Sequence, residues 1–296
     1  MNPADASALL PPLLAAADLD SHPVREEIRV WARSGVERVV FPGGGSAVFK
    51  YAEEPFDREH VALREAADAG VPVPTVLAAH AVDGLLGMLL EDLGQPVREA
   101  DDGDGAKAAV ALHQAPISDR LTILDSRALI DLPRRMLARA ELCTLTEPTV
   151  TAVRDLAGAA ESRAQGADLP PFGWCHSEFH PTSLLITTDG WRLLDFARAF
   201  TGPGLLDLAS WHGTLNAPDT ARLTEFLHRY VDAGGAKSTL EERGGLPAAV
   251  WALGWHRLWA AEWFSEQIER GWADADPSGW GQAIERHTLE AAELLL

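Results

Sequence analysis

The sequence is poor in cysteine, in long apolar runs and in basic residues near its N-terminus. Its two cysteines, Cys143 and Cys175, exclude a disulfide framework or a cysteine-based zinc site, and they favour a reducing cytosol. No apolar run reaches the roughly 18 residues needed to cross a bilayer. Residues 1–20 lack basic side chains and contain a proline pair, so we expect no signal peptide. These absences together predict a cytoplasmic protein that has no membrane partner.

Positive charge is also scarce along the whole chain. Lysine and arginine total 25 against 44 aspartates and glutamates, which gives a formal net charge of −19. Such a surface repels a phosphate backbone, so we expect no nucleic acid partner. Two interpretations of the acidity stay open. It favours a cationic substrate, or it serves solubility alone.

The first third of the chain predicts a small sheet with one packed helix. We expect one or two helices in residues 1–30 and then strands at 31–41 and 47–52, joined through a glycine-rich turn at 43–45. Helical periodicity follows at 58–69. A proline-rich loop and an apolar strand then lead to Gly94.

The remainder predicts a mainly helical region. An acidic linker at 101–105 precedes a helical stretch at 106–165, and helical spacing returns from residue 205. Between them lies a β-rich island at 172–199, whose TTDG turn indicates a hairpin. The fold class is therefore α+β and two-lobed, with a division at residues 1–94 and 95–296.

A lysine in an apolar strand is the first candidate functional residue. Lys50 stands alone in AVFKYA, where a compact positive charge can contact nucleotide phosphates. The alternative is a lysine on an edge strand that faces water. Glu59 lies nine residues later, in the first turn of the predicted helix, where it can hold the lysine in place. Glu65 is the competing candidate.

The segment HSEFHPTS and the hairpin after it carry the second group of candidates. Glu178 and His176 lie in a predicted loop, Ser183 follows five residues after Glu178, and Asp195 ends the second strand of the hairpin. Phosphoryl transfer needs an acid that orients the attacking hydroxyl and oxygen ligands for magnesium. Glu178 can supply the first function, and Ser183 with Asp195 the second. Asp207, near a predicted helix start, is expected to be structural.

The run HSEFHPTSLLITTDGWRLLDFARAFTGPGLLDLA resembles the catalytic loop and metal segment of aminoglycoside phosphotransferases and of related choline- and homoserine-kinase-like proteins. REHVALREAADAGVPVP resembles their lysine-partner helix, and GMLLEDLG resembles their hinge. The resemblance covers about residues 30–270. It implies a protein-kinase-like fold in which the first lobe binds nucleotide and the second carries the catalytic loop and the acceptor site.

The resemblance also implies the cosubstrate and the roles of single residues. It implies ATP or GTP with Mg²⁺, and a small-molecule hydroxyl as acceptor. It makes Lys50 the phosphate lysine, Glu59 its partner and Asp195 the magnesium aspartate. The other residues that it implies are His176 in the loop scaffold, Ser34 and Gly35 in the phosphate loop, and Glu91 and Leu93 in the hinge.

Three residues of the loop depart from the family pattern. Glu178 replaces the catalytic aspartate, Ser183 replaces an asparagine metal ligand, and Ser177 replaces a glycine. Alternative functions therefore stay open. They are a pseudokinase that binds nucleotide or a partner, a kinase of the same fold that modifies Ser or Thr of a natural-product peptide, and a metal site formed by His176, Glu178 and His180.

A late aromatic stripe also has two interpretations. Tryptophans at 251, 255, 259 and 263 line one side of a predicted helix, with Glu262 and Glu266 beside them. Core packing is one interpretation of this pattern. The other is an acidic, aromatic-walled pocket for a cationic or flat substrate.

Overall fold

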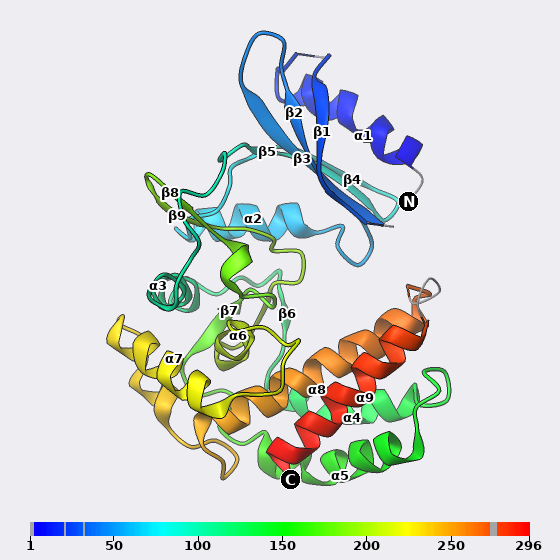
Figure 1. The fold of residues 1–296 in the computed structure, drawn as a ribbon, viewed down its shortest axis with the longest axis vertical. Coiled ribbons are helices and arrows are strands. Elements are labelled where there is room, and N and C mark those ends of the chain that lie inside the picture. Colours follow the sequence, from blue (N-terminus) through cyan, green and yellow to red (C-terminus); the bar gives the residue numbers. More distant parts are fainter. Residues whose placement is uncertain (1–2, 21, 32, 273–276) are drawn as a thin grey trace. The chain divides into compact units, whose positions relative to one another are not determined.

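The structure, a computed structural model, describes residues 3–20, 22–31, 33–272 and 277–296 (Figure 1). It divides into two compact units. Unit 1 comprises residues up to 100 together with 182–199, and unit 2 comprises 101–181 and 200–296. The predicted division at residue 94 placed the hairpin in the second part of the chain, whereas its contacts assign it to unit 1.

Unit 1 is built on a five-stranded antiparallel sheet with the strand order β1-β2-β3-β5-β4. Its strands are β1 Val24–Val30, β2 Ser34–Val40, β3 Ser46–Glu53, β4 Val76–Val82 and β5 Leu85–Glu91. The glycine-rich turn at 43–45 joins β2 to β3, as predicted, with Val40 opposite Ser46. Strand β3, which carries Lys50, is the central strand.

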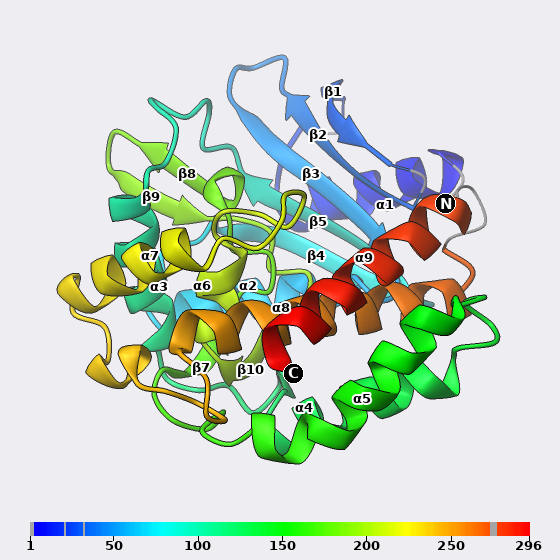
Figure 2. The same ribbon diagram turned by 60° about the horizontal axis from the view of Figure 1, so that its bottom comes forward.

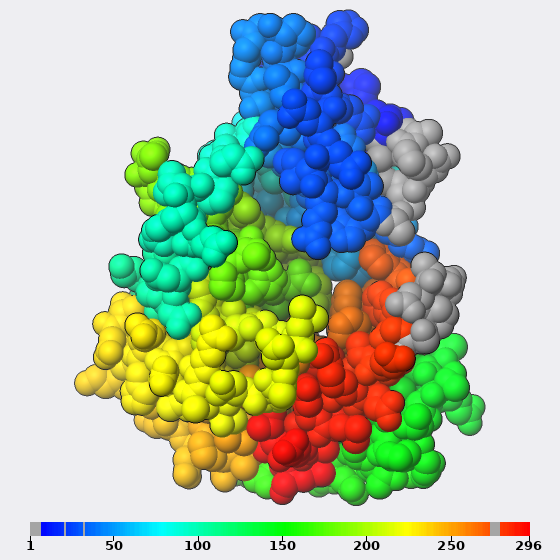
Figure 3. Space-filling model, in the orientation of Figure 1, coloured from blue at the N-terminus to red at the C-terminus, as the bar shows by residue number. Residues whose placement is uncertain are grey.

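Strand β1 corrects the expectation of further helix before residue 30. It pairs antiparallel with β2, from Val24 opposite Val40 to Val30 opposite Gly35. All seven of its residues are exposed, and Figure 3 shows this segment in dark blue on the surface of unit 1. The arginines and glutamates of VREEIRV favour helix in isolation. Pairing with β2 overrides that local preference because it satisfies the backbone of the strand.

Two helices pack against the sheet of unit 1. Helix α1, Pro3–Ala16, buries Leu9 and Leu13 in a core with Phe49 and Leu89. A side chain at Gly87 of β5 would meet Leu9 at 3.0 Å, so the glycine allows this close approach. Helix α2, Glu59–Asp68, buries its apolar face and confirms the predicted helix.

The predicted hairpin is present as β8, Leu184–Thr187, and β9, Gly190–Leu193. Thr187 lies opposite Gly190 across the TTDG turn. The backbone N–H of Leu193 donates to the carbonyl of Pro72 at 2.9 Å, and Arg98 forms a β-bridge with Ile186. These backbone contacts explain why the hairpin belongs to unit 1.

Unit 2 is mainly helical, as predicted. Its helices are α3 Asp102–His113, α4 Ser126–Ala138, α5 Glu147–Arg163, α6 Leu205–Ser210, α7 Thr220–Asp232, α8 Ala248–Glu269 and α9 Pro277–Leu295. Short 3₁₀ turns lie at Lys237–Leu240 and, directly before β8, at Pro181–Ser183. Helix α9 runs beside α8 (Figure 2). No helix in the described ranges combines the length and the apolar character that a membrane span requires.

A small three-stranded sheet inside unit 2 positions the candidate loop. Its strands are β6 Thr122–Ile123, β7 Phe172–Cys175 and β10 Phe200–Pro203, in the order β6-β10-β7. The sequence predicted strand at β7, inside the β-rich island, but not at the two-residue β6 or at β10, whose Gly202 and Pro203 are typical of turns. Strand β7 ends directly before His176.

The tryptophan stripe lies on α8 and packs into the core at its first half. Trp251 and Trp255 are buried, and their indole N–H groups donate to the carbonyl of Arg163 at 2.6 and 3.2 Å. Core packing is therefore confirmed for these two residues. Glu262 is buried and contacts Arg135 at 2.9 Å and Arg139 at 2.7 Å, so its charge is already balanced inside the protein.

A buried histidine on α9 predicts acid sensitivity. His287 is 2% exposed, and its Nδ1 lies 3.1 Å from a guanidinium nitrogen of Arg257. Burial, followed by the charges of Arg257 and Arg286, lowers the pKa of His287 to about 3. The unfolded chain therefore binds a proton between about pH 6.5 and 3 that the folded chain does not, so stability falls as the pH falls through this window.

We expect His287→Gln to remove this part of the pH dependence. Between pH 6.5 and 4 the wild type should lose about 3 kcal/mol more of unfolding free energy than the variant, at about 1.4 kcal/mol per pH unit. Urea unfolding at a series of pH values measures this difference. His22→Gln, at an exposed position, is the control and should follow the wild type. Parallel profiles for wild type and His287→Gln would contradict the assignment.

Candidate active site

Lys50 joins three elements of unit 1. Its Nζ lies 2.8 and 2.7 Å from the two carboxylate oxygens of Glu59 on α2. The same nitrogen lies 2.8 Å from Oδ1 of Asp195, two residues after the end of β9. The edge-strand interpretation is wrong, because β3 is central and the side chain of Lys50 is only 14% exposed. The competing candidate, Glu65, is not among its partners.

The electrostatics of this cluster keep the lysine charged. Burial by itself lowers the pKa of Lys50, but the charges of Glu59 and Asp195 outweigh it, and the pKa lies above its ordinary value. Burial raises the pKa of Glu59 to about 7, against the opposing charge of Lys50. The cation is therefore held against a buried carboxylate on one side. On the other side lies Asp195, whose side chain is 45% exposed.

Asp195 and Ser183 are the two predicted metal ligands, and both lie in unit 1. The backbone N–H of Leu194 donates to the carbonyl of Ser183 at 2.8 Å, which brings the two segments together. Asp195 has a φ of +66°, an unusual backbone conformation that is frequent at functional sites. One carboxylate and one hydroxyl suit Mg²⁺, which keeps several waters and takes further oxygens from phosphates.

The loop that carries Glu178 is held by α6 within unit 2. The carboxylate of Asp207, which is fully buried, accepts the backbone N–H groups of His176 at 2.6 Å and Ser177 at 2.8 Å. Ser210 Oγ donates to the carbonyl of Phe179 at 2.8 Å. Residues on both sides of Glu178 are thus fixed, and Glu178 itself is half-buried. The structural role expected for Asp207 is confirmed.

This loop does not form the alternative metal site. His176 is fully buried, and β7 ends at Cys175, so His176, Glu178 and His180 do not alternate along a strand. Within the described ranges, no group of three or more His, Cys, Asp or Glu side chains is arranged to hold a metal ion.

Ser177 occupies a backbone conformation that favours glycine. Its φ is +78°, in the left-handed region that costs a residue with a Cβ about 1–2 kcal/mol. Its buried hydroxyl has no hydrogen-bond partner among the residues that the structure describes. The departure from the family glycine therefore carries a stability cost without a compensating contact.

We expect Ser177→Gly to stabilise the protein by about 1 kcal/mol, because relief of the backbone strain exceeds the extra chain entropy of glycine in the unfolded state. Denaturant unfolding measures the change. Ser177→Ala is the matched control, since it removes the hydroxyl but keeps the Cβ. An alanine variant at least as stable as the glycine variant would contradict the strain argument.

Two buried residues behind Asp207 were not found from the sequence. His113, at the end of α3, lies 3.5 Å from Asp207 Oδ2 through Nε2 and 3.2 Å from the Tyr230 hydroxyl through Nδ1. Tyr230 comes from α7, more than a hundred residues away. His113 is the last residue of α3, and no local pattern in the sequence indicated that it or Tyr230 lies beside Asp207.

The predicted hinge follows β5, and Asp92 fixes its shape. Asp92 accepts hydrogen bonds from Arg38 Nε and Ser46 Oγ, both at 2.6 Å, and from the backbone N–H of Gly94 at 3.0 Å. The carboxylate of Glu91 accepts the backbone N–H of Thr75 at 3.1 Å. The backbone N–H of Leu93 has no hydrogen-bond partner among the described residues. Sequence reasoning missed Asp92, although its position in an acidic pair after a strand was a signal.

Ser34 and Gly35 lie in strand rather than in a loop. They are the first two residues of β2, and Gly35 lies opposite Tyr51 of β3. A Cβ at Gly35 would meet the Tyr51 hydroxyl at 2.3 Å, so the ring itself requires a glycine here. The expectation of a loop at these residues is corrected, because their backbone pairs with β3.

Comparison with known proteins assigns the family. The sequence model of the phosphotransferase enzyme family matches residues 38–249, which is most of the chain. The protein belongs to the phosphotransferase enzyme family. The matched region contains Lys50, Glu59, Glu178 and Asp195. A search of curated proteins found no match.

Solved structures of other phosphotransferases share the fold of this family member. A putative aminoglycoside phosphotransferase from Ralstonia eutropha has a TM-score of 0.67 at 14% identity, with 98% of each chain covered. A choline/ethanolamine kinase family protein from Mesorhizobium loti has a TM-score of 0.62 at 21% identity, again with 98% of each chain covered. An amicoumacin kinase in complex with AMP-PNP and Ca²⁺ has a TM-score of 0.61 at 12% identity, covering 91% of this chain and 88% of its own. The predicted α+β, protein-kinase-like fold is confirmed.

Proposed function

We propose that this phosphotransferase moves the γ-phosphate of ATP or GTP to a hydroxyl group of a small molecule. The observation that carries the proposal is the bridge of Lys50 between Glu59 and Asp195. A protonated lysine held by a buried glutamate, next to a partly exposed aspartate, is the arrangement that positions nucleotide phosphates and their metal ion in kinases. The family membership of the chain and the AMP-PNP bound by one relative support the same conclusion.

Each candidate side chain has its own proposed role in phosphate transfer. Lys50 contacts the phosphates, and Asp195 with Ser183 would hold Mg²⁺, which neutralises charge on the phosphate oxygens when bound. Glu178 accepts the proton of the acceptor hydroxyl and orients it. His176, buried beside Phe179 with 6.3 Å between ring centroids, keeps the loop in shape. Glutamate has the chemistry of the usual aspartate with one more methylene.

The base of the nucleotide is proposed to lie against the hinge. The carbonyl of Glu91 and the N–H of Leu93 offer an acceptor and a donor two residues apart, which suits the edge of a purine. Asp92 keeps this backbone in place through Arg38 and Ser46. Ser34 and Gly35, at the start of β2, are proposed to line the phosphate side.

A second candidate function is nucleotide binding without transfer. It is favoured by Glu178 and Ser183, two of the three departures from the family pattern, because misplacement of a catalytic group by about 1 Å can lower turnover by 10². Lys50 and Asp195 are retained under both functions. A measurement of nucleotide binding therefore tests the property that both functions share, and a measurement of phosphate transfer distinguishes them.

Calorimetry with Mg²⁺-ATP and Mg²⁺-GTP tests the nucleotide site. We expect millimolar or tighter binding of at least one of them, and Lys50→Ala should weaken it about tenfold or more, the scale of a hydrogen bond to a charged group. Lys107→Ala, at an exposed position, is the control and should bind like the wild type. Thermal unfolding checks that Lys50→Ala folds. No heat and no thermal shift with either nucleotide would contradict the proposal.

A transfer assay then separates the two candidate functions. The acceptor library should include aminoglycosides, macrolides, choline and ethanolamine, the compound classes in the names of the structural relatives, together with hydroxyl-bearing peptides. Transfer above background to one class establishes the enzyme and its acceptor. Nucleotide binding without transfer to any class favours the pseudokinase.

A further inference from the structure

A cavity of about 430 Å³ is lined wholly by residues of unit 2, none of which is among the site residues assigned above. It is bounded by the α4–α5 connection, by the end of α8 and by the beginning of α9. Its apolar walls come from Leu142, Leu145 and Ile268, and its volume falls in the range of small-molecule sites. The mechanism proposed above does not use this cavity.

A chain of hydroxyl groups presents one carboxylate to this cavity. Thr149 Oγ1 lies 2.9 Å from Thr146 Oγ1, and Thr146 Oγ1 donates to Glu285 Oε1 at 3.2 Å. A hydroxyl has a single hydrogen, so Thr149 donates to Thr146 when Thr146 donates to Glu285. All three residues line the cavity. The hydrogen bond from Thr146 uses Oε1 of Glu285, and Oε2 accepts no hydrogen bond from the described residues.

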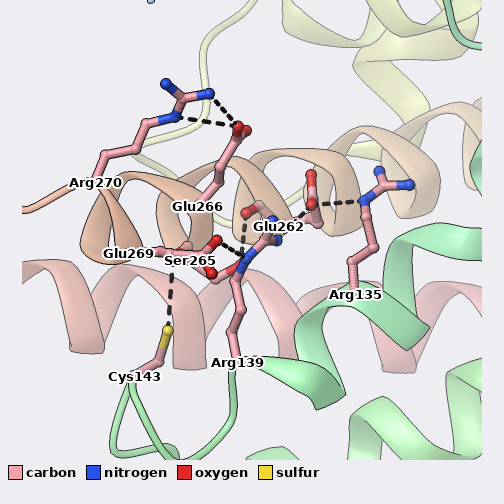
Figure 4. Close-up of polar contacts among 8 residues, drawn as sticks. All are labelled: Arg135, Arg139, Cys143, Glu262, Ser265, Glu266, Glu269 and Arg270. Carbon is pink, nitrogen blue, oxygen red and sulfur yellow. Dashed lines mark hydrogen bonds and ion pairs between the residues drawn. The ribbon is translucent and has the colours of Figure 1, made fainter.

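Glu285 differs from the acidic side chains around it. Figure 4 shows Glu262, Glu266 and Glu269 of α8 beside arginines, and their closest contacts are 2.7–2.9 Å. On α9, Glu290 lies 3.2 Å from Arg257. Glu285 is half-buried, and no lysine, arginine or histidine pairs with it among the described residues.

We propose that this cavity binds a small molecule that carries one protonated amine on an apolar group, with Glu285 as its counter-charge. The ammonium donates to the Glu285 carboxylate, and the apolar group contacts the leucines and Ile268. Among the described residues of the lining, Glu285 is the single ionised side chain, so one ammonium group matches its charge. The proposal concerns binding to unit 2 alone and does not rest on phosphate transfer.

The test uses the full chain with methyl-labelled leucine and isoleucine, titrated with 2-phenylethylamine and with its neutral counterpart 2-phenylethanol. We expect shifts at the methyl groups of Ile268 and Leu145, and an affinity for the amine at least about tenfold above that for the alcohol. Glu285→Gln should abolish the difference between the two probes. Glu293→Gln is the matched control, because it lies exposed on the same helix, and it should keep the difference.

A second variant blocks the cavity itself. A Cβ at Gly281 would meet no atom within 4 Å, so Gly281→Leu can fill this space on α9 without disturbing the backbone. It should remove the binding of both probes while the melting temperature is kept or raised, since leucine favours helix over glycine. The proposal is overturned if neither probe binds, if the alcohol binds as well as the amine, if Glu285→Gln keeps the tenfold preference, or if Gly281→Leu folds and still binds.

Discussion

Glu178→Gln is expected to lower kcat by about 10² or more, the usual scale for a positioned acid or base. The amide cannot accept the proton of the acceptor hydroxyl, although its shape is almost the same. The backbone around it should stay in place, because Asp207 holds His176 and Ser177, and Ser210 holds Phe179. Nucleotide affinity should barely change, since Glu178 is assigned to the acceptor rather than to the phosphates. Steady-state kinetics and calorimetry measure the two quantities.

Glu178→Asp sharpens this test. If the site is built for the longer side chain, the shorter one should also lower activity, despite restoring the residue that the family pattern has. Activity that rises from near zero in Glu178→Asp would instead identify the natural protein as an impaired kinase with a binding role. If a measurable transfer reaction is unaffected by both substitutions, Glu178 is not the acid or base. The loop would then be structural.

Asp207→Ala is expected to lower the unfolding free energy by about 3 kcal/mol or more. The substitution leaves two buried backbone N–H groups, those of His176 and Ser177, without their acceptor, at about 1–3 kcal/mol each. It also removes the carboxylate that faces His113. Denaturant unfolding measures the loss as a lower midpoint with an unchanged slope.

Asp219→Ala serves as the control for Asp207→Ala. Asp219 caps α7 on the surface of the same unit through the backbone N–H of Arg222, and its loss should cost about 1 kcal/mol. Equal losses for the two variants would show that Asp207 is an ordinary cap. Asp207→Asn keeps one carbonyl oxygen and should lie between the alanine variant and the wild type. Where Asp207→Asn and Asp207→Ala fold, turnover should fall from the wild type to Asp207→Asn and further to Asp207→Ala. The reason is that the loop that carries Glu178 is held less firmly in each.

Much of the candidate site was predictable because its signals are local in the sequence. Lys50 and Glu59 lie nine residues apart, on a strand and on the helix after it, so their ion pair follows from short-range geometry. The TTDG turn predicted the hairpin because turn chemistry depends on a few adjacent residues. The helices of unit 2 followed from an apolar period of 3.6 sustained over many turns.

The expectations that failed depended on partners far along the chain. Strand β1 has the composition of a helix and is extended because β2 pairs with it. Ser34 and Gly35 belong to a strand because β3 pairs with them. One interpretation of the tryptophan stripe was a pocket for a cation beside Glu262. Arg135, in α4, and Arg139, directly after α4, already neutralise this glutamate.

The sequence by itself determined the family, the fold class and the identity of the side chains that can carry phosphoryl transfer, because these depend on residue types in a fixed order. Only the tertiary structure decided which charged side chains pair with one another and which can contact a ligand. It gives Lys50 two carboxylate partners and gives the acids of α8 their arginines. It leaves Glu285 beside a cavity with the hydroxyl of Thr146 as its one partner among the described residues. The physical reason is that a charge in a folded protein acts through the groups within a few ångströms of it, and folding brings those groups from distant parts of the chain.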